Sequence, residues 1–307
     1  MKKNKKVIAV VVTYNRLELL KQCIEALRKQ SHPLEGILVV NNGSTDGTSE
    51  WLAEQKDIYA VHQENLGGAG GFYTGFAEAL KQNVDWVWAM DDDCIAHPEA
   101  LQALVQQADD PNNIYCSVAV DAQKPEQLCW ITKDIDGRKI KDVKQLGEQP
   151  IEVSGVPFLA IFLSTVLIKR IGFPIKEFFI WGDDTEYCWR SRKKANSRVF
   201  YIPQSRVYHP PTEYVPIHLL PFIPPILLVK AAPWKLYYSF RNNTFTNRLY
   251  SPPFKYYFFY LPKTIAKLWL SRKHIFKDAS KQHLKKMFKA IYAGHRGKLG
   301  KVDYERL

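Results

Sequence analysis

Short apolar runs alternate with amphipathic stretches along the first two thirds of the chain. The run Val7–Val12 is followed by a helical pattern over residues 17–29, and a second run, Ile37–Val40, precedes another helical pattern through Gln55. Continuous aliphatic runs of this length are typical of strands that are buried on both faces. Strands and helices that alternate at this spacing predict parallel βαβ units. We therefore expect an α/β fold, with a Rossmann-like, mostly parallel sheet that has helices on both faces.

Polar clusters follow these apolar runs. A third strand is expected at Ile58–Val61, the glycine-rich segment Asn65–Gly71 precedes a helix expected over residues 72–82, and Trp86–Met90 gives a fourth strand. Ligands of such sheets bind beyond the carboxyl ends of the strands, where these clusters would gather. The later pattern predicts a strand at 114–120, a loop or hairpin to 152, an apolar segment at 156–168 and a strand at 198–202.

The composition changes past His209-Pro210-Pro211, where aromatic residues, prolines and lysines become frequent. Residues 215–307 contain 18 Lys and Arg residues against 3 Asp and Glu residues, so this segment carries +15 while the whole chain carries +12. Helical patterns are expected at 263–270 and 282–292. We predict an α/β domain at 1–213 and a helical, basic and aromatic C-terminal region at 214–307.

This charge asymmetry indicates an anionic partner for the C-terminal region. Aromatic side chains interleaved with cations suit the headgroup boundary of a bilayer, where each Lys or Arg contributes about 1 kcal/mol. Prolines interrupt the apolar segment Val215–Val229, so a spanning helix is not expected. Nucleic acid is a rival partner, but no RRM-type or zinc signature is present. The third interpretation is a solvated helical cap or a subunit interface, which keeps a homo-oligomer open.

The five cysteines are scattered and have no CxxC spacing, which argues against a disulfide framework and against a zinc site. This pattern indicates a reducing compartment. The apolar run Val7–Val12 is too short for the core of a signal peptide. We therefore expect a cytoplasmic location, with peripheral attachment to an anionic membrane surface.

Three consecutive aspartates, Asp91, Asp92 and Asp93, directly follow the apolar run Trp86–Met90. Mutual repulsion makes this arrangement unfavourable without a counter-cation. Mg²⁺ and Mn²⁺ take oxygen ligands, and one or two carboxylates usually hold them together with the phosphates of a substrate. The triplet therefore predicts a metal-diphosphate site. A solvated acidic turn that opens a helix near Pro98 is the alternative interpretation.

Three other segments suggest nucleotide binding, each beside a simpler interpretation. Residues 13–16, Thr-Tyr-Asn-Arg, offer hydroxyl, amide and guanidinium groups suited to a nucleotide, although Asn15 also fits a helix N-cap. Asp46 either accepts a hydrogen bond from a base or braces its own turn. The glycines of residues 67–71 allow a diphosphate to approach a helix N-terminus, but glycines are also common at tight turns.

A second acidic pair, Asp183-Asp184, precedes an amphipathic helix and lies close to Trp181 in the sequence. A carboxylate beside an aromatic wall suits a general base that removes a proton from a sugar hydroxyl. A negatively charged helix N-terminus is the alternative. The imidazole of His209 suits a metal ligand, although a lone histidine is more often an ordinary surface or core residue.

Taken together, these segments resemble a known family. In chain order they are Thr-Tyr-Asn-Arg, Asn-Asn-Gly-Ser-Thr-Asp-Gly-Thr, Asn-Leu-Gly-Gly-Ala-Gly-Gly, Asp-Asp-Asp, Trp-Gly-Asp-Asp-Thr-Glu and Tyr-His. The set looks like the inverting GT-A glycosyltransferases of the family-two type, and it is most similar to bacterial galactofuranosyltransferases and rhamnosyltransferases of surface polysaccharide synthesis. The resemblance covers residues 7–211. The segments Tyr237–Asn243 and Gly294–Gly300 also look like parts of this group.

The resemblance implies a role for each matching position. The residues that would hold the nucleotide or the diphosphate-sugar side of the donor are Thr13, Tyr14, Asn15, Arg16, Asn41, Asp46, Asn65, Gly68 and Asp92. Asp91, Asp93 and His209 would bind Mn²⁺ or Mg²⁺. Asp184 would be the catalytic base, while Trp181 and Asp183 would face the acceptor. Many relatives have an acidic residue where this chain has Asn41, whose amide can hydrogen-bond a uracil or thymine edge instead.

The activity implied by the resemblance is a metal-dependent, inverting transfer of galactofuranose from UDP-galactofuranose. The implied acceptor is a lipid-linked glycan of capsule, O-antigen or cell-wall polysaccharide synthesis, reached at the inner face of the bacterial plasma membrane. A rhamnosyltransferase that uses dTDP-rhamnose is the close alternative. An inactive nucleotide-sugar-binding scaffold is the alternative from another class, and five acidic site positions disfavour it: Asp91, Asp93, Asp183, Asp184 and Glu186.

Overall fold

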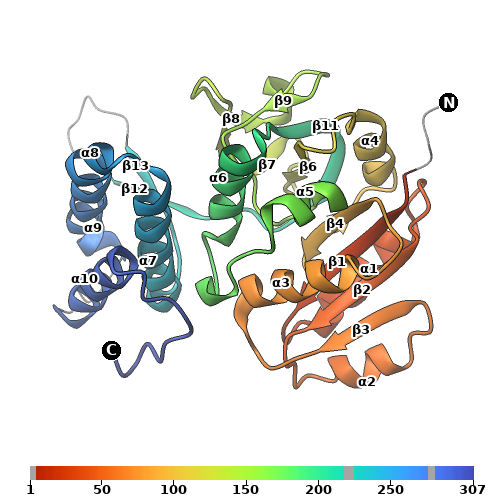
Figure 1. The fold of residues 1–307 in the computed structure, drawn as a ribbon, viewed down its shortest axis with the longest axis horizontal. Helices are drawn as coiled ribbons and strands as arrows, with labels where there is room; N and C mark the ends of the chain where they lie inside the picture. The colour runs from red at the N-terminus through yellow and green to blue at the C-terminus, as the bar shows by residue number, and fades with distance from the viewer. Residues whose placement is uncertain (1–4, 218–224, 276–280) are drawn as a thin grey trace. The chain divides into compact units, whose positions relative to one another are not determined.

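The structure, a computed structural model, describes residues 5–217, 225–275 and 281–307 (Figure 1). Contacts divide it into two compact units, the first formed by residues 1–176 and 184–211 and the second by residues 177–183 and 212–307. Besides the basic C-terminal region, the second unit thus includes the short segment Glu177–Asp183. Residues 218–224, inside the proline-interrupted segment considered above, lie outside the described residues.

A mixed sheet forms the centre of the first unit, with the strand order β3-β2-β1-β4-β10-β6-β11-β5. Strands β3, β2, β1 and β4 are parallel neighbours, and β6 and β11 form a second parallel pair. β10 lies antiparallel between β4 and β6. The predicted α/β class with a mostly parallel sheet is confirmed. The apolar segment at 156–168 turns out to supply β10 and most of α5.

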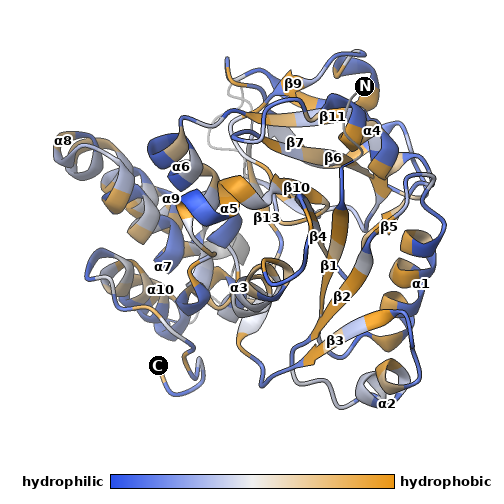
Figure 2. Ribbon diagram, turned by 45° about the vertical axis from the view of Figure 1, so that its right-hand side comes forward, coloured by the Kyte–Doolittle hydropathy of each residue, from blue (hydrophilic) through white to orange (hydrophobic). Residues whose placement is uncertain are grey.

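Both faces of this sheet are buried, as the continuous apolar runs predicted. In β1, Ile8, Val10 and Val12 belong to the hydrophobic cluster that includes residues of α3, α5 and α6, while Val7, Ala9 and Val11 belong to the cluster that includes residues of α1 and α4. Figure 2 shows the resulting apolar centre as a band of hydrophobic strands that includes β1 and β2. A strand with two buried faces is apolar along its length, so polar residues gather in the loops beyond its ends.

The bounds of these elements follow the sequence pattern closely. In the first unit they are β1 (Val7–Thr13), α1 (Leu17–Arg28), β2 (Gly36–Asn41), α2 (Thr48–Ala53), β3 (Ile58–His62), α3 (Gly67–Ala79), β4 (Trp86–Asp91), β5 (Ile95–Ala96), α4 (Ala100–Gln107), β6 (Ile114–Val120), β7 (Gln127–Lys133), β8 (Lys139–Asp142), η1 (Val143–Gln145), β9 (Ile151–Glu152), β10 (Ile161–Ser164), α5 (Thr165–Ile171), η2 (Lys176–Phe178), α6 (Asp183–Ala195) and β11 (Val199–Tyr208). α6 begins in the second unit and η2 bridges the two. The stretch expected to be a loop or hairpin contains the antiparallel pair β7–β8.

Helix α3 differs from the expectation, because it begins at Gly67 and not near residue 72. A Cβ at Gly71 would lie 2.3 Å from Cγ1 of Val12, and one at Gly75 would lie 2.4 Å from Cγ1 of Val10. These glycines therefore let the helix pack directly on β1. The glycine-rich segment Asn65–Gly71 was expected to precede the helix, whereas residues 67–71 form its first turns.

The second unit is mainly helical. Its elements are β12 (Tyr214–Ile217), β13 (Ile226–Val229), α7 (Pro233–Tyr250), α8 (Pro253–Lys255), the π-helical turn η3 (Tyr256–Tyr260), α9 (Leu261–Ile275) and α10 (Lys281–His295). Its core contains Tyr237 and Phe240 of α7 together with Met287 and Ile291 of α10. Among the residues that the structure describes, no helix combines the length and the apolar character needed to cross a bilayer.

Candidate active site

The acidic triplet lies where β4 ends, beside the end of β1. Trp86–Met90 are buried, and Asp91 is the last residue of β4, where it pairs with Val12 of β1. The chain therefore delivers Asp92 and Asp93 next to the loop that follows Thr13. The predicted position of the triplet at the carboxyl edge of the sheet agrees with the structure.

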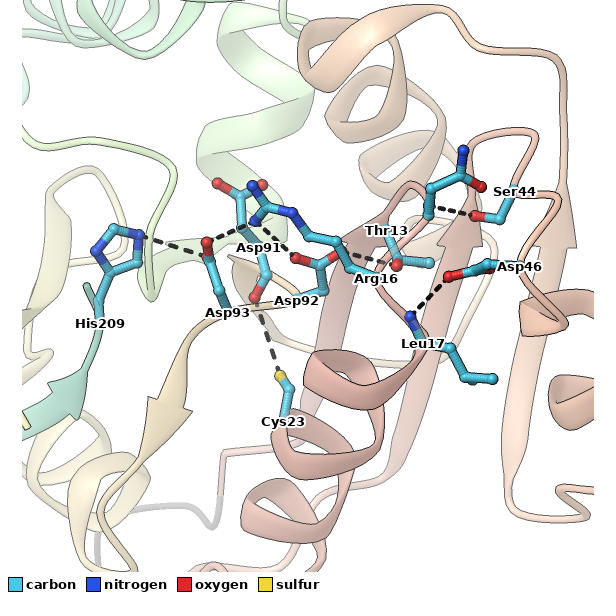
Figure 3. Close-up of polar contacts among 11 residues, drawn as sticks. Thr13, Arg16, Leu17, Cys23, Ser44, Asp46, Asp91, Asp92, Asp93 and His209 are labelled. Atoms are coloured by element: carbon cyan, nitrogen blue, oxygen red, sulfur yellow. Dashed lines mark hydrogen bonds and ion pairs between the residues drawn. The ribbon is translucent and has the colours of Figure 1, made fainter. Parts of the chain in front are cut away.

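Asp92 is turned inward and joins the two strand ends. Its Oδ2 accepts a hydrogen bond of 2.8 Å from Oγ1 of Thr13, and its Oδ1 lies 3.3 Å from Nη1 of Arg16 (Figure 3). Burial raises the pKa of Asp92 to about 6, although the bonds from Thr13 and Arg16 oppose the rise. Because both carboxylate oxygens of Asp92 have partners inside the protein, Asp92 holds the loop of residues 13–16 beside the end of β4.

Asp93 contacts two groups from distant parts of the chain. Its Oδ2 lies 2.6 Å from Nη1 of Arg16, and its Oδ1 lies 3.4 Å from Nε2 of His209 (Figure 3). Burial alone would raise the pKa of Asp93, but His209 and Arg16 together hold it below the ordinary value. Asp93 is therefore ionised at neutral pH.

His209 reaches this place because the short strand β5 pairs with the end of β11. Ile95, two residues after Asp93, pairs with Tyr208. His209 directly follows Tyr208, so this pairing brings His209 next to the triplet. The ring of Trp130 lies edge-on to the imidazole, with 5.9 Å between the ring centroids. The sequence analysis did not single out Trp130, and its place in the hairpin strand β7 gives no local signal of a site.

The contact between Asp93 and His209 tests whether a divalent cation fits here. Nδ1 of His209 lies 2.6 Å from the carbonyl oxygen of Pro210, which only accepts, so Nδ1 donates and the ring orientation is fixed. Nε2 lies 3.4 Å from Oδ1 of Asp93, a buried oxygen with no hydrogen-bond partner. A carboxylate oxygen and an imidazole nitrogen on facing side chains are donor types that fit a divalent cation.

The predicted third ligand, Asp91, does not complete a protein cage. Over residues 5–217, 225–275 and 281–307, no three His, Cys, Asp or Glu side chains converge as a metal-binding group. In Figure 3 the carboxylates of Asp91 and Asp93 extend from the same strand end. An incomplete protein shell agrees with the preference of Mg²⁺ and Mn²⁺ for substrate phosphates as the remaining ligands.

Two loops predicted to hold the nucleotide brace each other. The backbone N–H of Asn15 donates to Oγ of Ser44 at 2.9 Å, and Oδ1 of Asn15 accepts from the backbone N–H of Thr45 at 2.7 Å. Asn15 has a φ of 53°, in the left-handed region that asparagine tolerates better than most residues. The cap of α1 is not Asn15, since the N-cap position is Arg16.

Asp46 and Asn41 also have internal partners. Oδ2 of Asp46 accepts from the backbone N–H of Leu17 at 2.9 Å, which caps α1, and its Oδ1 accepts from Oγ1 of Thr48 at 2.5 Å. The buried amide of Asn41 donates to Oγ of Ser49 at 2.8 Å. Of the two interpretations of Asp46, the structure shows the bracing of its turn. Both residues thus define the shape of the loop.

The neighbouring Tyr14 and Gly68 are more open. The side chain of Tyr14 is 45% exposed, and a Cβ built at Gly68 would meet no atom within 4 Å. Oδ1 of Asn65 accepts from the backbone N–H of Gly67 at 2.9 Å and so braces the turn that leads into α3. The structure therefore leaves space for a ligand against the first turn of α3, which carries the partial positive charge of a helix N-terminus.

Asp184 lies at the same edge of the sheet as the triplet. Tyr187, one turn further along α6, packs on Phe158 with 5.5 Å between the ring centroids. Phe158 lies just before β10, whose first residue, Ile161, pairs with Ala89 near the carboxyl end of β4. α6 ends at Ala195, and β11 then begins at Val199, beside the first residue of β6 at the opposite edge of the sheet. Burial raises the pKa of the Asp184 carboxyl above its ordinary value, although hydrogen bonds from Thr185 oppose the rise.

Glu186 has a structural role that the sequence analysis did not anticipate. Its two oxygens pair with Arg190 at 3.0 and 2.6 Å, and both side chains are buried. Asp183 and Trp181 belong to the segment Glu177–Asp183 of the second unit. Trp181 has a φ of 62° and lies with its ring 5.9 Å from Nζ of Lys235.

Comparisons with known proteins give the family and the fold of the chain. The sequence model of a family described as "Glycosyl transferase family 2" matches residues 8–170. The galactofuranosyltransferase GlfT1 of Mycolicibacterium smegmatis is 28% identical over 190 residues, which cover 59% of this chain and 63% of that protein. The chain thus spans less than two thirds of the length of this relative.

Two further proteins extend the comparison. An undecaprenyl-phosphate mannosyltransferase of Micrococcus luteus is 33% identical over 106 residues, covering 33% of this chain and 43% of that protein. The crystal structure of GalNAc-T7 with UDP, GalNAc and Mn²⁺ superimposes with a TM-score of 0.62 at 14% identity, covering 96% of this chain and 58% of that one. At this identity the superposition establishes a shared fold.

Proposed function

Since the chain belongs to glycosyl transferase family 2, we propose that it transfers galactofuranose from UDP-galactofuranose to a lipid-linked glycan acceptor, with inversion at the anomeric carbon. The observation that carries the proposal is the buried Oδ1 of Asp93, which has no hydrogen bond and faces Nε2 of His209 at 3.4 Å. The relative named as a galactofuranosyltransferase supports this sugar. The relative named as an undecaprenyl-phosphate mannosyltransferase supports a lipid-linked acceptor.

The donor would bind along the carboxyl edge of the sheet. Residues 13–16 and 41–48 form the braced loops that receive the nucleotide, and the open space at Gly68 receives the diphosphate-sugar side. Asp93, His209 and Asp91 would hold Mn²⁺ or Mg²⁺, which supplies positive charge next to the leaving diphosphate. A solved protein of the same fold that contains UDP and Mn²⁺ supports this choice of ligands.

The chemical step is a single displacement. The acceptor hydroxyl forms a bond to the anomeric carbon while the bond from that carbon to the diphosphate oxygen breaks. Asp184 accepts the hydroxyl proton, and the nucleoside diphosphate leaves with the bonding electrons. Its raised pKa makes Asp184 a stronger base than an ordinary carboxylate, which suits this role. Trp181 and Asp183, directly before it in the chain, would face the acceptor.

The second unit would attach the protein to an anionic membrane surface. We define its aromatic surface as Phe254, Tyr257, Phe258, Phe259 and Trp269, which are between 51% and 68% exposed. Leu261 and Ile265 continue the apolar character along α9 and line a hollow with Trp269. Large exposed aromatic side chains in a segment of net charge +15 suit insertion at the level of lipid headgroups.

Transfer assays with a panel of donors test the activity. Purified protein with Mn²⁺ and a membrane fraction that contains acceptor lipids should incorporate sugar from UDP-galactofuranose, and Asp184→Asn should abolish this incorporation without loss of UDP binding. Incorporation from dTDP-rhamnose alone would identify the rhamnosyltransferase alternative. UDP binding without transfer or hydrolysis of any donor would support the inactive scaffold.

A further inference from the structure

The segment that precedes Asp184 has an unusual backbone. Phe179 and Trp181 have φ values of 64° and 62°, and Gly182 has a φ of 90°. Bulky side chains rarely adopt this left-handed region, and such conformations persist only where the surroundings over-determine them. Something in the second unit must therefore hold residues 178–182 in this shape.

Asn242, a buried residue of α7, is the first of two residues that hold this segment. Its amide nitrogen lies 3.0 Å from the carbonyl oxygen of Phe178, 3.1 Å from that of Ile180 and 2.7 Å from that of Trp181. A Cβ at Gly182 would lie 3.2 Å from Cβ of Asn242. One side chain thus gathers three carbonyl groups of a single turn and fills the space below its glycine.

Arg241, the preceding residue in the sequence, is the second. Its guanidinium group donates to the carbonyl oxygens of Glu177 at 3.1 Å and Phe178 at 2.9 Å, and also to that of Gly300. Its Nε donates to Oδ1 of Asn242 at 2.8 Å, which orients the amide so that its nitrogen faces the loop. Arg241 is fully buried, and every hydrogen-bond partner of its guanidinium group in the described chain is a neutral oxygen.

A buried cation without a carboxylate is expensive to retain, and hydrogen bonds to neutral carbonyl groups offset only part of its desolvation. Burial accordingly lowers the pKa of Arg241. An apolar residue of similar volume would fill this site at lower cost. The cation is therefore better explained by the backbone that it holds than by the stability of α7.

We propose that Asn242 and Arg241 are positioning residues that fix the segment Phe178–Gly182, and through it the direction in which α6 presents Asp184. The segment also carries Trp181, so the same two side chains would orient the acceptor wall. The inference rests on the proposed role of Asp184. It adds two buried residues that lie about 60 positions along the chain from the base.

The test compares Asn242→Ala with Asn243→Ala. Asn243 is the exposed neighbour whose amide bonds within its own helix, to the carbonyl oxygen of Ser239 at 2.8 Å. Asn242→Ala should lower kcat for transfer by about ten- to a hundredfold, because small misplacements of a catalytic group have effects of this size. The dissociation constant for UDP with Mn²⁺ should stay within about twofold of wild type. Asn243→Ala should match wild type in both.

Hydrogen exchange gives a readout independent of activity. Residues 178–182 should exchange faster in Asn242→Ala than in Asn243→Ala, while residues 7–13 of β1 stay protected in both. Faster exchange in Asn242→Ala with unchanged kcat would overturn the positioning role. Unchanged exchange in Asn242→Ala would show that Asn242 does not hold residues 178–182 in place. If Asn242→Ala does not fold, Arg241→Lys tests the same loop, since it keeps the charge but loses the fork that reaches three carbonyl groups.

Failure of the proposed function gives a different pattern. A fully active Asp184→Asn enzyme would remove the base role, whatever the exchange data show. An inactive Asp184→Asn enzyme together with a fully active Asn242→Ala enzyme would overturn only the inference made here. The pH profile adds a further check, because a displaced Asp184 should shift the acid limb of kcat/KM in Asn242→Ala and not in Asn243→Ala.

Discussion

Replacement of glycine by alanine is expected to have opposite effects on stability at two positions of α3, Gly71 and Gly68. A Cβ at Gly71 would lie 2.3 Å from Cγ1 of Val12, 3.1 Å from its Cγ2 and 3.3 Å from its Cβ. Rotation about χ1 of Val12 cannot relieve this overlap, because both methyl groups are close and the side chain is buried. Overpacking of this kind costs about 1–3 kcal/mol. Gly71→Ala should therefore lower the free energy of unfolding by about that amount.

Gly68→Ala is expected to behave differently, since its Cβ would meet nothing within 4 Å. Alanine favours a helix over glycine by up to about 1 kcal/mol, so the free energy of unfolding should stay unchanged or rise by up to that value. If the diphosphate of the donor occupies this space, the added methyl group should weaken UDP-sugar binding. The loss of one close contact worth about 1.4 kcal/mol corresponds to roughly tenfold in Kd.

Urea denaturation and calorimetric titration with UDP and Mn²⁺ separate the two effects. A Gly71→Ala protein as stable as wild type would refute the close packing of α3 on β1. A Gly68→Ala protein that binds UDP and transfers sugar as wild type does would refute the donor contact at the first turn of α3. Gly137→Ala is unsuitable as a control, because its φ of 87° would strain any other residue.

Three further predictions concern the metal, the base and the membrane. Asp93→Asn and His209→Ala should each weaken Mn²⁺ binding, measured by thermal shift with UDP present, by at least about tenfold; unchanged affinity would exclude both as ligands. Because the pKa of Asp184 is raised and its base form is ionised, kcat/KM should fall as pH decreases through a midpoint above the ordinary carboxyl value, and a midpoint at or below it would contradict this. Replacing Phe258 and Trp269 with serine should reduce flotation with anionic liposomes, whereas Tyr59→Ser, at an aromatic residue of β3 that is 49% exposed, should not; equal loss in both would refute the aromatic surface as the site of attachment.

The parts of the fold that follow from local patterns could be predicted from the sequence. Val7–Val12 and Trp86–Met90 are apolar throughout because their strands are buried on both faces, and the turn that must follow each strand holds the polar residues. The placement of Asp91–Asp93 at the carboxyl edge depends on this pattern alone. Helix α3 was placed too late because its glycines indicate either a loop or close packing, and the distinction depends on Val12, which no local pattern reveals.

Long-range pairings explain what the sequence could not give. β5 has two residues and no recognisable pattern, yet its ladder with β11 brings His209 to Asp93. Glu186 was grouped with the acidic site because of its position beside Asp184. A helix places residues four apart on the same side, so Arg190 at that spacing was a signal for the ion pair. The Arg241–Asn242 contacts cross about 60 positions and leave no trace in periodicity.

The hydrogen bonds of the candidate site divide its residues into two classes that respond differently to substitution. Asn15 and Asp46 have several internal partners, so their loss should reduce stability and nucleotide binding together, because the loop changes shape. Asp93 has an oxygen without a hydrogen bond, and Gly68 faces open space, so neither has all of its binding capacity used by the fold. Substitution at Gly68 should weaken ligand binding without a matching loss of stability, whereas substitution of Asp93 also removes its ion pair with Arg16. An oxygen without a hydrogen bond and a backbone position beside open space therefore locate the ligand better than the polar character of the residues alone.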